Sequence, residues 1–216
     1  MRLIGMLDSP YVRRVAISLQ LLGLPFEHQS LSVFRTYDRF RAINPVVKAP
    51  TLVCEDGTVL MDSALILDYA EALARPACTL LPATLPALRR ELRLAGLALA
   101  GCDKAVQHYY ELTQRPPERR HAPWLDRVTA QMRAAFGELE RELAHQPLPA
   151  ASSAELTQAG ITAAVVWHCV QSTLPGVVDA AAHPALAAHS ARAEALPEFR
   201  AAPHSGGTAH VSGSAA

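Results

Sequence analysis

Three short stretches near the start of the chain carry side chains that could bind or activate a small ligand. Residues 7–14 read LDSPYVRR, residues 44–53 read NPVVKAPTLV, and residues 61–69 read MDSALILDY. Each stretch lies where a predicted strand or helix begins or ends, and in an α/β sheet the loops at such ends converge. The sequence therefore predicts one site that is assembled from three separate segments.

Two of these stretches contain a serine at a predicted helix start. Ser9 followed by Pro10 is typical of an N-cap with proline at the first helical position. At Asp62-Ser63, a hydroxyl and backbone N–H groups at a helix N-terminus can bind a carboxylate, while the neighbouring acid can hold a cationic amine. Both pairs could also be ordinary helix caps, so the residues alone leave the two interpretations open.

The elements that must position these segments alternate between strand and helix up to about Arg75. Short apolar or alternating runs predict strands, helical spacing of apolar residues predicts helices, and Asp56-Gly57 indicates a hairpin. The predicted strands are residues 3–6, 26–31, 51–54 and 58–60, and the predicted helices are residues 10–22, 34–43 and 63–73. This βαβ, α, ββα order is typical of a thioredoxin-like domain.

After Arg75 the pattern is entirely helical. Prolines mark a connector, and apolar residues then recur at helical spacing over residues 88–106, 125–143, 156–171 and 183–197. From Ala201 onward the chain contains no charged residue, which predicts a disordered tail. The predicted organisation is a thioredoxin-like α/β domain, a linker, an all-helical domain and a tail, at residues 1–75, 76–86, 87–200 and 201–216.

Composition excludes several classes of function. Lys and Arg total 20 and Asp and Glu total 20, so the chain lacks the cationic surface of a nucleic-acid-binding protein. The four cysteines are widely spaced and match neither a zinc site nor a disulfide framework. No segment has the length and apolarity of a membrane span or a signal peptide. We therefore expect a cytoplasmic protein that uses no metal and binds neither membrane nor nucleic acid.

In this order and at these separations, the three stretches resemble those of the cytosolic glutathione S-transferases, in the bacterial form with an N-terminal serine motif. The resemblance covers nearly the whole chain, including the helical part and its closing segment HPALAAHSARAEALPEFRA. It implies a thioredoxin-like domain that binds glutathione as co-substrate, and a helical domain that shapes a pocket for an electrophile.

The resemblance also implies roles for individual residues. Ser9 would face the glutathione sulfur as the catalytic hydroxyl, because a hydrogen-bond donor near the positive end of a helix favours thiolate over thiol. Tyr11 is the rival hydroxyl, although it falls inside the helix. A cis bond at Ala49-Pro50 would expose backbone groups to a peptide-like ligand. Lys48 would meet the glycine carboxylate of glutathione.

Asp62 and Ser63 would bind the γ-glutamyl end, which carries an amine and a carboxylate on one carbon. Candidates for the second-substrate pocket are aromatic residues, which on long helices often belong to the core instead; they are Tyr11, His108, Tyr109 and Trp124. One departure concerns the Ser/Thr-x-x-Asp capping box of the family's central helix. We match it to the stretch that starts at Thr162, where Val165 replaces the acid.

The predicted activity is conjugation of the glutathione thiolate to an apolar electrophile, as in detoxification. The resemblance further implies a homodimer, for which we expect the helix after Ser63 and the first long helix of the second domain to form the interface. Two alternatives remain open. One is glutathione-dependent reduction of disulfides or peroxides, which serine in place of cysteine at position 9 disfavours. The other is a non-catalytic glutathione-binding or regulatory protein.

Overall fold

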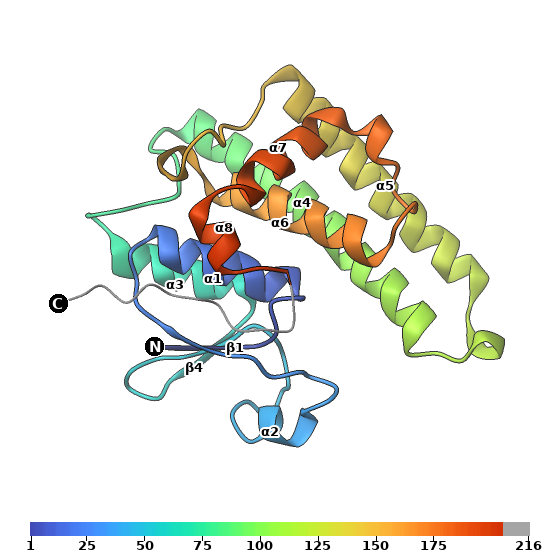
Figure 1. The fold of residues 1–216 in the computed structure, drawn as a ribbon, viewed down its shortest axis with the longest axis horizontal. Helices are drawn as coiled ribbons and strands as arrows, with labels where there is room; N and C mark the ends of the chain where they lie inside the picture. The colour runs from blue at the N-terminus through green and yellow to red at the C-terminus, as the bar shows by residue number, and fades with distance from the viewer. Residues whose placement is uncertain (205–216) are drawn as a thin grey trace. The chain divides into compact units, whose positions relative to one another are not determined.

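The computed structural model of the protein describes residues 1–204 (Figure 1). The chain divides into two units, which we call the sheet unit and the helical unit. Among the described residues, the sheet unit contains Met1–Leu80 together with residues 195–204, and the helical unit contains Leu81–Glu194. The sequence assigned residues up to 200 to the helical domain, so the structure moves the closing segment to the other unit.

The sheet unit has the thioredoxin-like arrangement that the sequence predicts. Its four strands lie in the order β2-β1-β3-β4, with β1 parallel to β2 and antiparallel to β3. The strands are β1 (Arg2–Ile4), β2 (Glu27–Gln29), β3 (Thr51–Val53) and β4 (Val59–Met61), and the helices are α1 (Pro10–Leu21), α2 (Tyr37–Arg41) and α3 (Ser63–Ala74). Figure 1 shows α1 and α3 on one side of the sheet and α2 on the other.

Apolar side chains on both faces of the short strands hold these layers together. Ile4, Leu31 and Phe40 form a buried cluster, through which α2 covers one face of the sheet. On α1, apolar residues at helical spacing are fully buried, among them Val12 and Val15. The predicted helix 34–43 shortens to Tyr37–Arg41, since its preceding turn is held by the Ser32 and Thr36 side chains instead.

The closing helix α8 (Pro197–Ala201) belongs to the sheet unit and lies beside α1 (Figure 1). Arg13, on α1, is 1% exposed, and its guanidinium donates to the carbonyl of Ala202 at 2.7 Å and to that of Phe199 at 3.3 Å. The predicted tail therefore starts too early, because Ala202 is buried. The rest of that prediction, residues 205–216, lies outside the described residues.

The helical unit is built around α6, which is apolar on nearly every side and packs against α4 and α7. Its helices are α4 (Leu85–Thr113), α5 (Ala122–His145), α6 (Gln158–Thr173) and α7 (Pro184–Glu194), with short 3-10 turns at Pro117–Arg119, Ser153–Glu155 and Ala180–Ala182. Pro86, which the sequence assigned to the linker, lies in the first turn of α4, where proline is tolerated. Among residues 1–204, no helix is long and apolar enough to cross a membrane.

The start of α6 differs from the sequence interpretation. Its N-cap is Thr157, whose side chain accepts a hydrogen bond from the Gly160 N–H at 3.3 Å. Thr162 lies a turn further on and donates to the Gln158 carbonyl, so the match of the capping box to Thr162 and Val165 is wrong. Glycine occupies the position of the capping acid, and the buried carboxylate of Glu91 on α4 accepts the Ala159 N–H instead. A neighbouring helix thus supplies an acceptor to the first turn of α6, for the N–H of Ala159 and not for the Thr157 N–H that a capping acid would bind.

Candidate active site

Strand register brings the three chemistry-bearing segments to one edge of the sheet. Ile4, the last residue of β1, pairs with Thr51, the first residue of β3. Thr51 in turn pairs with Met61, the last residue of β4. The segment that leaves β1, the segment that enters β3 and the segment that leaves β4 therefore meet at the same end of three adjacent strands. We call this end the site edge.

Ser9 leads from the site edge into α1. It has an extended backbone, it is half-buried, and its Oγ accepts a long 3.5 Å hydrogen bond from the Val12 N–H. Since the hydroxyl acts as acceptor in this bond, its own proton can be donated to a further atom. The N-cap interpretation is thus confirmed, and it leaves the hydroxyl able to donate.

Close packing at Gly5 joins this first segment to the second. Gly5 has a φ of +138°, and a Cβ there would lie 2.6 Å from Val12 Cγ2 and 3.3 Å from Ala49 Cβ. Any side chain at this position would push the start of α1 away from the loop that enters β3. Glycine therefore allows the two segments to approach each other closely.

A short hydrogen-bond chain holds the loop before β3. Asn44 is 1% exposed, and its amide donates to Thr51 Oγ1 at 2.8 Å, while Thr51 Oγ1 donates to the Lys48 carbonyl at 2.7 Å. The Ala49-Pro50 bond that follows is cis, as the resemblance implied. Asn44 begins the second of the three stretches, and no local pattern predicted that its side chain would be buried and would hold this loop.

Lys48 and Asp62 come from different segments and lie together at the site edge. Lys48 Nζ is 3.7 Å from Asp62 Oδ2, and each side chain is about half exposed, at 49% and 48%. Such an exposed pair contributes little to stability, so ligand groups can compete for both partners. Asp62 also caps α3 through the Ala64 N–H at 3.0 Å, with a φ of +72°. A non-glycine residue with this backbone is strained and is typical of functional sites.

Ser63, the first residue of α3, is more enclosed than the sequence indicated. It is 4% exposed, and its Oγ accepts a hydrogen bond at 3.2 Å from Nη1 of Arg14, which is also 4% exposed. Sequence reasoning gave Arg14 no role, although it lies within the first of the three stretches. The arginine and the serine are 49 positions apart, and nothing in either local pattern links them.

The candidates for a second-substrate pocket differ in their surroundings. Tyr11 is half-buried on α1. His108 is buried on α4, its Nδ1 lies 2.9 Å from Thr129 Oγ1 on α5, and desolvation lowers its pKa below the ordinary histidine value. Tyr109 and Trp124 keep 39% and 38% of their surfaces exposed. Their role in binding a second substrate stays a prediction.

A thioredoxin-like sheet unit with this edge, followed by an all-helical unit, is the architecture of glutathione S-transferases. Residues 3–77 match the family model of the glutathione S-transferase N-terminal domain, and residues 122–192 match that of the C-terminal domain. The chain belongs to the glutathione S-transferase family.

Solved structures of similar proteins cover almost the entire chain. A glutathione S-transferase from Methylobacterium radiotolerans, solved in complex with glutathione sulfonate, is 32% identical, with a TM-score of 0.82 and 92% of each chain covered. A glutathione transferase family member from Pseudomonas fluorescens Pf-5, solved with S-(propanoic acid)-glutathione, is 30% identical, with a TM-score of 0.76 and coverage of 94% and 98%.

The curated relatives match over a shorter length. The uncharacterized GST-like protein YibF of Escherichia coli K12 is 34% identical over 86 residues, which is 40% of each chain. This match supports the family and leaves the activity of the whole protein to be proposed.

Proposed function

We propose that this protein is a glutathione transferase, which joins the sulfur of glutathione to an apolar electrophile. The observation that carries the proposal is the strand register, because it sets Ser9, Lys48-Ala49 and Asp62-Ser63 at one edge of the sheet. Similar proteins at 30–32% identity were solved with glutathione derivatives, which supports glutathione as the co-substrate.

In this proposal the tripeptide lies along the site edge with its two charged ends held apart. The half-exposed Lys48 takes the glycine carboxylate, and the backbone of Ala49, before the cis bond to Pro50, pairs with the cysteinyl residue. Asp62 takes the γ-glutamyl amine, while the start of α3 at Ser63 takes the γ-glutamyl carboxylate. The glycine carboxylate then competes with Asp62 for Lys48, and the γ-glutamyl amine competes with Lys48 for Asp62.

Ser9 acts on the sulfur. Its hydroxyl donates a hydrogen bond to the thiolate, and the positive end of α1 adds a favourable potential at the same point. The thiol proton leaves to solvent, and the thiolate electron pair forms a C–S bond to the electrophilic carbon. With a chlorinated aromatic substrate, chloride leaves with the electrons of the broken C–Cl bond. The Tyr11 hydroxyl is the alternative donor.

The remaining parts of the proposal concern the second substrate, assembly and location. Tyr11, His108, Tyr109 and Trp124 are the candidates for contacts to the electrophile, and detoxification is the expected role. We propose a cytoplasmic protein, in keeping with cysteines whose wide spacing matches no disulfide framework.

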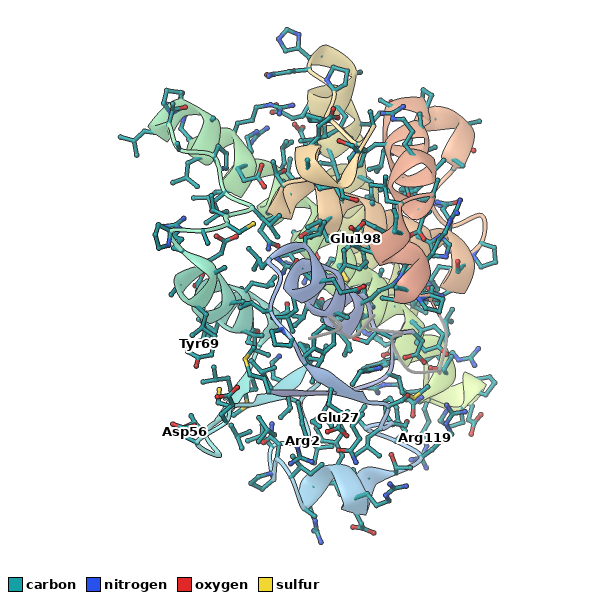
Figure 2. The ribbon with its side chains drawn as sticks, turned by 60° about the vertical axis from the view of Figure 1, so that its left-hand side comes forward. Arg2, Glu27, Asp56, Tyr69, Arg119 and Glu198 are labelled. Carbon is teal, nitrogen blue, oxygen red and sulfur yellow. The ribbon has the colours of Figure 1, made fainter. Side chains whose placement is uncertain are left out.

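A homodimer through α3 and α4 is the proposed assembly. On α3, Leu65, Tyr69 and Leu73 recur every fourth residue and are 63%, 36% and 45% exposed. Figure 2 shows Tyr69 on α3 at the surface of the sheet unit. Leu85 and Leu92 of α4 are 80% and 60% exposed. Exposed apolar rows of this kind are typical of surfaces that a partner covers.

Calorimetric titration with glutathione tests the proposal directly. We expect saturable heat, and competition by S-substituted glutathione, from the purified chain. Turnover should then be compared between a chlorinated nitroaromatic and a small disulfide. Conjugation faster than disulfide reduction supports the transferase, and the reverse order supports a reductase. Binding without turnover of either substrate supports a non-catalytic glutathione-binding protein, and no binding at all refutes the proposal.

A further inference from the structure

Two adjacent arginines on α1 are both almost fully buried and hold different partners. Arg13 is 1% exposed and donates to backbone carbonyls at the closing helix α8. Arg14 is 4% exposed and donates to the Ser63 hydroxyl at the start of α3. Burial of a guanidinium is costly unless its N–H groups are satisfied. The contacts to α8 give Arg13 a structural role. The contact of Arg14 to Ser63 lies at the site edge and points to a different role.

The Arg14 contact fixes the direction in which Ser63 can act. Guanidinium groups only donate hydrogen bonds, so Ser63 Oγ is the acceptor in the 3.2 Å contact. The single proton of the hydroxyl must then point away from Arg14 and remains available to an acceptor at the site edge. An arginine behind the serine thus converts a freely rotating hydroxyl into an oriented donor.

Charge at this end of α3 supports the same role. Asp62, the N-cap residue of α3, holds its carboxylate at the helix N-terminus, where it accepts the Ala64 N–H at 3.0 Å. A ligand carboxylate that approaches Ser63 is repelled by this neighbour, and half-exposed Lys48 compensates only in part. The buried charge of Arg14 lies directly behind Ser63, where the surroundings screen it less than water would.

We infer that Arg14 is a positioning residue for a carboxylate at the start of α3: it orients the Ser63 hydroxyl and offsets the charge of Asp62. The inference rests on the proposed function, in which that carboxylate belongs to the γ-glutamyl end of glutathione. It adds a residue to which sequence reasoning gave no role, and it assigns the selection of an α-amino carboxylate to a side chain that need not touch the ligand.

The test compares two ligands on matched variants. The first ligand is glutathione, and the second is 4-aminobutanoyl-cysteinyl-glycine, which lacks only the γ-glutamyl carboxylate. Arg14→Gln removes the charge and keeps a donor, and Arg14→Lys keeps the charge but loses the planar fork. Arg13→Gln is the control, because it changes an equally buried arginine one position away. Calorimetry gives Kd for each pair, and thermal melting reports on folding.

We expect Arg14→Gln to weaken glutathione about tenfold, as for loss of a charge-assisted interaction, while the affinity for the analogue stays within twofold of wild type. The preference for glutathione over the analogue therefore falls in Arg14→Gln, falls less in Arg14→Lys, and is unchanged in Arg13→Gln even if its melting temperature drops. In steady state, KM for glutathione rises and kcat at saturation is retained.

Equal weakening of both ligands in the Arg14 variants would overturn the inference, since Arg14 would then only pack α1 against α3. If Arg14→Gln does not fold, the preference of Arg14→Lys decides by the same comparison. A wild-type protein that binds neither ligand refutes the proposed function itself. A wild type that binds both ligands equally keeps that function and refutes only the carboxylate subsite and the role of Arg14.

Discussion

Replacement of Glu91 should change the stability of the helical unit in a pH-dependent way. Glu91 is 5% exposed and accepts the N–H of Ala159 in the first turn of α6. Glu91→Ala leaves this buried N–H without its acceptor. We therefore expect a loss of about 1–3 kcal/mol in the free energy of unfolding.

Glu91→Gln separates the hydrogen bond from the charge. Desolvation raises the pKa of Glu91 above the ordinary glutamate value of 4.5, against the opposing effect of its hydrogen bonds to Ala159 and Thr157. As the pH rises above 4.5, the unfolded chain therefore loses this proton first and the folded protein retains it. Wild type must lose stability relative to Glu91→Gln as the pH rises through this window.

Urea unfolding followed by the fluorescence of Trp167, which is buried on α6, measures this difference between about pH 4 and pH 8. Glu142 provides a control of opposite sign, because its hydrogen bond to Arg93 lowers its pKa. The advantage of wild type over Glu142→Gln should therefore grow only as the pH rises to about 4.5 and stay constant above it, and the gain should be less than about 1 kcal/mol, since the pair is near the surface. The reasoning would be refuted if the free energy of unfolding of wild type, relative to that of Glu91→Gln, stayed constant or increased as the pH rose.

Three further predictions concern the sheet unit. Ser9→Ala should lower the conjugation rate at least about tenfold while removing only a long cap bond worth about 1 kcal/mol; full activity with unchanged stability would instead favour Tyr11. Burial lowers the pKa of His28 below 6.5, so the free energy of unfolding should fall as the pH drops below that value. In urea unfolding, the difference in this free energy between wild type and His28→Gln should therefore shrink, and a difference that does not change with pH contradicts the prediction. Leu65→Glu should convert a dimer into a monomer in sedimentation velocity, whereas the same change at the exposed Phe34 should not; a wild-type monomer would exclude the proposed assembly.

The sequence predicted those parts of the protein that depend on local spacing. The thioredoxin-like order, the helix starts at Ser9 and Asp62-Ser63, and the central position of α6 all follow from patterns within a few residues of each element. The site edge was also predictable, because the segments that leave β1 and β4 and the segment that enters β3 converge in this fold.

Features that depend on contacts between distant residues could not be predicted. Arg14 reaches Ser63 across 49 positions, and Glu91 reaches Ala159 across 68. The capping error has the same origin: with Gly160 in place of the expected acid, Thr157 gave no signal, and Thr162 offered a plausible alternative. The small residues near Ala202 resemble a loose tail until Arg13, which lies 189 positions earlier, is taken into account.

The bond between Arg13 and Ala202 has a consequence for biosynthesis. The sheet unit consists of two pieces of chain, and the second piece leaves the ribosome only after all of Leu81–Glu194 has been made. Until then the guanidinium of Arg13 lacks the two carbonyl acceptors that α8 supplies. A nascent chain that ends near Leu80 contains every strand of the sheet, yet the surface of α1 that α8 covers in the whole protein is exposed. A fragment cut at that point would need a replacement for α8 to reach the stability of the whole protein.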